Sequence, residues 1–290
     1  MVAIANRKKT ETHLSQWLFI GAFFWLPWLF IVGQSMIVFQ PANGVVQAII
    51  SAWYASGVVH LFIIPFTLAI AFYIIPRILG EPLSHQRLAP FAFWIYAFLA
   101  PWACGRYLMG GPYPAWVSIT TSVAAVILIL PVSLFTLMSL APVLKNISKA
   151  MSSPALRFTL TGVMMLTLYF FAQALFMLRV VNQQMQFTFY GEALYILGLY
   201  GGPLLILSGA FYYVLPHLME RQWLSATLIR AHYWGVTSGL VLAVVCMFLA
   251  GLSQGSLLNN PENGFTESLE LILPFLQGRS FGFLLIIIGH

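Results

Sequence analysis

The sequence predicts an all-α integral membrane protein, a helical bundle with about eight transmembrane helices. The chain is 60% hydrophobic and only 7% charged, and its mean hydropathy is +0.89. A soluble domain carries about 25% charged residues, so this composition cannot supply a water-facing surface. Apolar runs of about 20 residues, the length that crosses ~30 Å of hydrocarbon, recur from one end of the chain to the other.

The expected elements are a short polar tail followed by one membrane domain. Residues 1–16 form a cytoplasmic N-terminal tail, and residues 17–290 form the transmembrane domain. Turn-forming residues such as GGPYP and NNPENG separate the runs. We place the helices at 17–38, 48–76, 88–106, 115–141, 157–181, 190–216, 230–252 and 271–290. The last helix reaches the end of the sequence without a polar tail, which favours a native chain that continues beyond it.

The distribution of positive charge predicts the orientation. Ten of the thirteen Lys and Arg residues fall at one set of alternating helix ends, and cytoplasmic loops are the ones enriched in these residues. The N-terminus is therefore expected in the cytoplasm and the chain in the inner membrane of a prokaryote. The net charge of +6 does not indicate nucleic-acid binding, because no basic cluster is interleaved with aromatic residues.

Several stretches resemble the catalytic subunit, subunit I, of C-type (cbb-type) haem–copper oxidases, to which nitric oxide reductases are related. The most specific are FYIIP followed by EPLSHQRL, and AGLSQG after a helix that begins HYW. The resemblance runs in order over almost the whole chain and matches the last eight of that subunit's twelve helices. The matching stretches are 52–76, 93–116, 208–218, 232–255 and 278–289.

The resemblance also implies where metal and haem ligands would lie. In the family, three copper-ligating histidines occupy two neighbouring helices, two haem-ligating histidines occupy a later helix, and a further haem ligand lies on an earlier helix outside the match. Reading without gaps from the matching motifs, the five positions here are Ser56, Arg106, Tyr107, Leu194 and Ile196. The family's redox tyrosine falls at Ala100, and a functional glutamate falls near Ala172.

These replacements predict a degenerate copy that lacks its metal and haem ligands. Copper and haem iron are held by imidazole nitrogens, whereas a guanidinium has no lone pair for a metal and stays charged. We therefore expect no catalytic, cofactor-binding or metal-binding residue in this chain, with haem carried by partner subunits. Among the six histidines, His60 lies inside a helix, where hydrogen bonding to a neighbour is a simpler expectation than ligation.

Three arginines on the outer side are expected to be structural. Arg106, Arg179 and Arg279 lie at helix ends against the positive-inside bias, and each desolvated guanidinium needs a partner. We expect Glu192 to pair with Arg179, Arg279 to meet an acidic loop, and Arg106 to be held by helix-end carbonyls or a partner subunit. The acidic loop carries Glu262, Glu267 and Glu270. Such contacts would replace the metal centre as a cross-link between helices.

The first hypothesis for function is a non-catalytic structural subunit of a membrane respiratory complex of the cytochrome oxidase type. Its partners would be lipid and other membrane subunits, for instance a membrane-anchored cytochrome c. A second hypothesis is part of an active oxidase or nitric oxide reductase completed by another chain. A third is a proton or ion transporter, which would need intramembrane carboxylates; the chain has no Asp, and Glu192 is the only candidate.

Overall fold

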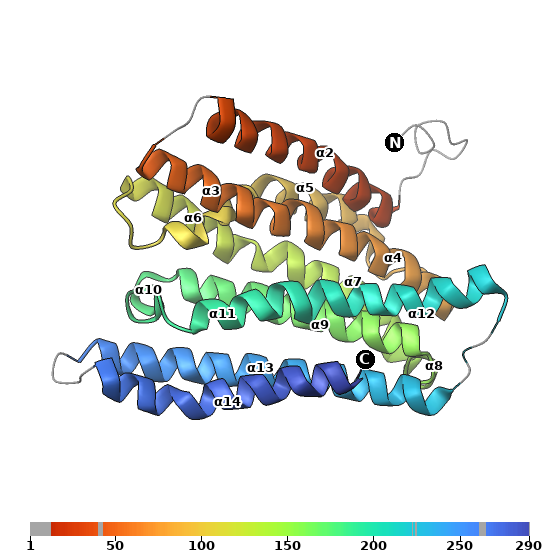
Figure 1. Ribbon diagram of the computed structural model, residues 1–290. Coiled ribbons are helices and arrows are strands. Elements are labelled where there is room, and N and C mark those ends of the chain that lie inside the picture. Colours follow the sequence, from red (N-terminus) through yellow and green to blue (C-terminus); the bar gives the residue numbers. More distant parts are fainter. Residues whose placement is uncertain (1–12, 40–42, 222, 224, 261–264, 290) are drawn as a thin grey trace.

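The structure is a computed structural model that describes residues 13–39, 43–221, 223, 225–260 and 265–289. Within these residues it is helical and contains no strand, so the all-α prediction is confirmed. Eight spans in the described part of the chain are long and apolar enough to cross a membrane, as expected. They run side by side in Figure 1.

The first four spans are each built from more than one helical segment. These segments are α2 (Leu14–Gln34) with η1 (Ser35–Phe39); α3 (Val45–Gly57), η2 (Val58–Ile63) and α4 (Ile64–Leu79); η3 (Gln86–Leu88), α5 (Ala89–Leu99) and η4 (Trp102–Leu108); and α6 (Ala115–Ile127) with α7 (Ile129–Lys145).

The remaining four spans follow two short connecting helices, α8 (Ile147–Ser152) and α10 (Arg179–Met185). The spans are α9 (Pro154–Met177); α11 (Tyr190–Tyr195), η5 (Ile196–Leu204) and α12 (Leu205–Met219); α13 (Ala226–Leu258); and α14 (Phe265–Gly289). Helix α9 lies in the middle of the bundle, between α2 at one edge and the α13–α14 hairpin at the other (Figure 1).

The region expected to be an acidic loop is mostly helical. Helix α13 continues to Leu258 and α14 already begins at Phe265, so Glu267 and Glu270 lie on the first turns of α14. Carboxylates are favoured there because the free N–H groups of a helix start carry partial positive charge. Glu262 lies outside the described residues. The loop is shorter than expected because Glu267 and Glu270 interrupt the apolar run in the sequence without ending the helix.

Two spans contain wide π-helical turns that precede prolines. In η2 the turn comes just before Pro65, and in η5 it includes Pro203. Proline has no N–H for the carbonyl four residues earlier, and its ring clashes with that carbonyl, so the helix widens locally. One of these wide turns carries His60, and the other begins at Ile196, one of the five positions that the resemblance singles out.

The α13–α14 hairpin is held by close approach of the two backbones. A Cβ atom added to Gly239 would lie 2.4 Å from the carbonyl oxygen of Gly282 and 2.8 Å from Cγ1 of Ile286. Small residues of this kind let membrane helices approach closely and gain van der Waals contact. Helix α14 packs mainly on α13, so the hairpin contact determines where α14 lies.

Candidate functional site

A buried polar cluster around His60 lies at the centre of the bundle. His60 is 2% exposed, and its Nδ1 lies 2.9 Å from the carbonyl oxygen of Ser56 one turn earlier. Its Nε2 lies 3.0 Å from Oε1 of Gln173 and 3.1 Å from the hydroxyl oxygen of Tyr169. Both partners come from α9, so His60 joins the second span to the central helix.

The hydrogen-bond partners of His60 define which ring nitrogen carries the proton when the ring is neutral. A carbonyl oxygen only accepts, so Nδ1 carries a proton and donates it to Ser56. In the neutral ring Nε2 is then the acceptor, and it receives the hydroxyl proton of Tyr169. Oε1 of Gln173 faces the same nitrogen, while the Gln173 NH₂ donates to the carbonyl oxygen of Ala103 at 3.5 Å, so Gln173 accepts from Nε2 when the ring is doubly protonated. In each arrangement both ring nitrogens are engaged by the protein.

A third helix closes the cluster. The hydroxyl of Tyr96, from α5, donates to the carbonyl oxygen of His60 at 2.6 Å. That carbonyl is in the wide turn, where the regular helical ladder is interrupted, so the tyrosine supplies a hydrogen bond that the helix does not. The ring of Phe170 packs edge-on against His60 at 5.9 Å. Side chains from three spans therefore meet at one histidine.

Arg106 lies close to this cluster but does not link helices as expected. It is 6% exposed and sits on η4; its Nη2 donates to the hydroxyl of the adjacent Tyr107 at 2.6 Å, and its Cζ lies 4.6 Å from the Tyr107 ring centroid. Its Nη1 is buried and finds no hydrogen-bond partner among the described residues. Among the described residues the expected contact with helix-end carbonyls is not formed, and the alternative, a contact with a partner subunit, stays a prediction.

Of the other positions singled out by the resemblance, Ser56, Leu194 and Ile196 are buried, whereas Tyr107 is exposed. Ser56 is 4% exposed and offers its carbonyl to His60, while Leu194 and Ile196 belong to the continuous apolar core, as does Met109. Within the described residues no three His, Cys, Asp or Glu side chains come together in a way that could hold a metal ion.

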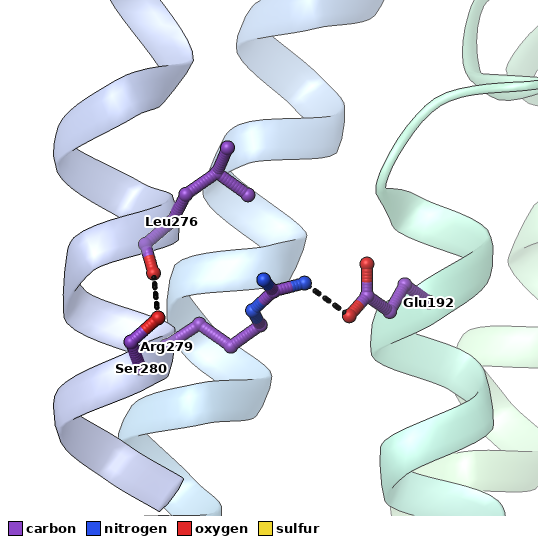
Figure 2. A network of polar contacts seen from close by, with 4 residues as sticks. All are labelled: Glu192, Leu276, Arg279 and Ser280. Atoms are coloured by element: carbon purple, nitrogen blue, oxygen red, sulfur yellow. Dashed lines mark hydrogen bonds and ion pairs between the residues drawn. The ribbon is translucent and has the colours of Figure 1, made fainter.

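Glu192 pairs with Arg279, and the expected pair with Arg179 is wrong. Nη1 of Arg279, on α14, donates to Oε1 of Glu192, on α11, at 2.5 Å (Figure 2). Arg179 instead begins the short helix α10 and is exposed. The expectation that Arg279 meets the acidic residues of its own hairpin is therefore also wrong. Closeness in sequence favours Arg179, whereas in the structure α13 packs against both α11 and α14 and so brings Arg279 within reach of Glu192.

We expect Glu192→Gln to lower the free energy of unfolding by about 1–2 kcal/mol, because it leaves the Arg279 guanidinium without its anion. Partial exposure of both side chains, 27% for Arg279 and 32% for Glu192, keeps the value below that of a fully buried pair. Unfolding in mixed detergent micelles measures it. Arg179→Gln is the matched control, with an expected change within about 0.5 kcal/mol. Equal effects of the two variants would contradict the assignment.

The sequence analysis did not identify the partners of His60. Tyr169 and Gln173 are four residues apart on α9 and so share one face of that helix. Two polar side chains on one face of an otherwise apolar span are a signal that they meet a polar group on a neighbouring helix. Tyr96 gave no comparable signal, because it is one of several aromatic residues on α5.

The fold defines a multi-pass helical membrane protein with a buried polar cluster around His60. The chain belongs to the cytochrome c and quinol oxidase polypeptide I family, whose model matches residues 1–285. The predicted resemblance to oxidase subunit I is confirmed. Together with its bacterial relatives, the eight spans make it a multi-pass prokaryotic membrane protein.

Among similar proteins, the cytochrome c oxidase subunit 1 homolog of Azorhizobium caulinodans is 25% identical over 301 residues, covering 99% of this chain and 55% of the relative. The cbb3-type cytochrome c oxidase subunit CcoN1 of Stutzerimonas stutzeri is 24% identical over 292 residues, covering 96% and 62%. The chain thus spans little more than half the length of these relatives. A heme-copper terminal oxidase dimer solved by cryo-EM shares the fold, with a TM-score of 0.79, 15% identity, and coverage of 99% of this chain and 57% of that chain.

Proposed function

We propose that this chain is a non-catalytic structural subunit of a membrane oxidase complex, and that it holds neither haem nor copper itself. The observation that carries the proposal is Arg106. It occupies a position where the oxidase resemblance places a copper-ligating histidine, it is buried, and it carries a fixed positive charge without a lone pair. A cupric ion beside it would be repelled and would lack a donor.

The residues at the other ligand positions do not fit the cofactors either. Ser56 and Tyr107 lack imidazoles, and Leu194 and Ile196 are aliphatic side chains in the apolar core. His60, the one buried histidine among the described residues, lies one helical turn from Ser56 but already uses both ring nitrogens in hydrogen bonds. On this proposal the polar cluster around His60 holds the three spans together where a metal centre would otherwise do so.

The proposed partners are other subunits of the same complex. The relatives are oxidase subunits of which this chain covers 55% and 62%. Because this chain is proposed to hold no haem, haem in the complex would lie in partner subunits, for instance a membrane-anchored cytochrome c. The proposed orientation has the N-terminus in the cytoplasm, from the positive-charge bias. The transporter alternative has lost support, because its only candidate carboxylate, Glu192, is engaged in the ion pair with Arg279.

The substitution Arg106→His tests the proposal. We expect copper per purified chain to stay at background, because Ser56 and Tyr107 still provide no imidazole and a single histidine does not make a copper site. Elemental analysis and electron paramagnetic resonance measure the copper. The variant that combines Ser56→His, Arg106→His and Tyr107→His is the positive control, since it rebuilds all three donors. Stoichiometric copper in the unaltered chain or in Arg106→His would contradict the proposal and favour an active oxidase part completed by another chain.

A further inference from the structure

The end of the bundle where α2 begins and α4 ends is on the right of Figure 1. Two adjoining hollows open at this end. The larger is a cavity of about 560 Å³ between α2, α4, the start of α5 and the loop that joins the second and third spans. The smaller is a groove of about 310 Å³ between α2, α4 and α12. They share the walls formed by Ser15, Gln16 and Tyr73, so one ligand can occupy both.

The larger cavity has a mixed polar and apolar lining that contains one arginine. Arg77 lines it, with its Cζ 4.9 Å from the ring centroid of Tyr73, and so do His13 and Gln86. None of the described residues that line it is acidic. The nearest carboxylate in the sequence, Glu81, is engaged elsewhere, because it accepts a hydrogen bond from Nδ2 of Asn146 at 2.9 Å. The cavity therefore favours a negatively charged group.

The groove beside it is apolar. Its walls beyond the shared residues are Phe19, Ala69, Ile70, Ile74, Ala210 and Val214. From Phe19 a series of aromatic contacts continues along the same pair of helices, through Phe66 at 5.8 Å and on to Phe62. A hydrocarbon chain that leaves the cavity can thus lie along a continuous apolar surface in the direction of the membrane interior.

We infer that this composite site binds an anionic phospholipid, with its phosphate-bearing headgroup at Arg77 and an acyl chain in the groove. A zwitterionic headgroup would bring an ammonium into a cavity whose described lining offers no carboxylate. A quinone would bring a neutral headgroup that leaves Arg77 without an anion.

Lipid retention tests the site. The full chain is extracted from vesicles that contain equal amounts of phosphatidylglycerol, phosphatidylcholine and ubiquinone, washed in detergent, and its bound lipids are counted by mass spectrometry. We expect phosphatidylglycerol to be retained selectively, and Arg77→Gln to reduce its retention about fivefold, the effect of one basic residue near an anionic headgroup. Arg77→Lys should keep most of it. The matched control is Arg87→Gln. Arg87 is an exposed arginine on η3 that lines neither hollow.

A second pair of variants tests the groove. Ala210→Phe fills it and should lower retention of the same lipid, whereas Leu207→Phe, at an exposed site on α12 outside the groove, should not. Helical circular dichroism and an unchanged unfolding temperature establish that each variant is folded. Equal loss in Arg77→Gln and Arg87→Gln, equal retention of phosphatidylcholine or ubiquinone, or no retained phosphatidylglycerol in the unaltered chain would overturn the inference.

Discussion

Replacing His60 by leucine is expected to lower the free energy of unfolding by about 3 kcal/mol. The substitution keeps the volume of the side chain but removes the partner of the Tyr169 hydroxyl and of the Gln173 amide, both of which are buried. A buried polar group left without a partner costs about 1–3 kcal/mol, and part of that cost is offset by the more apolar leucine. Unfolding in mixed detergent micelles, followed by circular dichroism, measures the change.

The double variant His60→Leu and Gln173→Leu shows whether the cluster acts as a unit. Because the second substitution removes one of the groups that the first leaves unpaired, the combined loss should be smaller than the sum of the two single losses by about 0.5–3 kcal/mol. His217→Leu is the control, since His217 is exposed on α12 and should change stability by less than about 0.5 kcal/mol. Simple additivity of His60→Leu and Gln173→Leu would contradict a connected cluster.

The second large effect is expected at the α13–α14 hairpin. Gly239→Leu would place its side chain where the Gly282 carbonyl and Ile286 now lie, so the two helices must separate. Overpacking of this kind costs about 1–3 kcal/mol. The upper end applies here because the atom nearest to the added side chain is a backbone carbonyl oxygen, which cannot move aside as a flexible side chain can. Since α14 packs mainly on α13, we also expect faster proteolysis within α14.

The control for Gly239 is another helical glycine. A Cβ atom at Gly191, on α11, would meet nothing within 4 Å, and Gly191→Ala is therefore expected to leave stability unchanged or slightly raised. If Gly239→Leu leaves the protease pattern of α14 as it is in the unaltered chain, close backbone approach is not what holds the hairpin.

The number and order of the spans could be predicted from the sequence because hydrocarbon thickness fixes how long an apolar run must be. Helix ends were less predictable. The last span begins at Phe265 rather than at Leu271, because a carboxylate at the start of a helix is stabilised by the free backbone N–H groups and does not interrupt it. The wide turns before Pro65 and around Pro203 follow from proline chemistry, but the apolar pattern alone does not indicate them.

The polar contacts were harder to predict, since they depend on which helices are neighbours. Glu192 and Arg279 are 87 residues apart, and the sequence alone favoured the nearer Arg179. His60 was correctly expected to hydrogen-bond to a neighbour, but its partner Gln173 is 113 residues away. Arg106 was expected to be held by helix-end carbonyls or a partner subunit, whereas among the described residues its hydrogen bond is to the adjacent Tyr107. The cross-links come instead from His60 and from the Glu192–Arg279 pair.

The most direct test of the account is an absorbance spectrum combined with iron and copper analysis of the purified full chain, and of the complex it purifies with. We expect no Soret band and no stoichiometric metal with the chain alone, and a haem spectrum of the complex that is unchanged by His60→Leu at a temperature where that variant remains folded. Iron or copper at one atom per chain, lost in His60→Leu, would show that this histidine is a ligand and would contradict the proposal of a non-catalytic subunit.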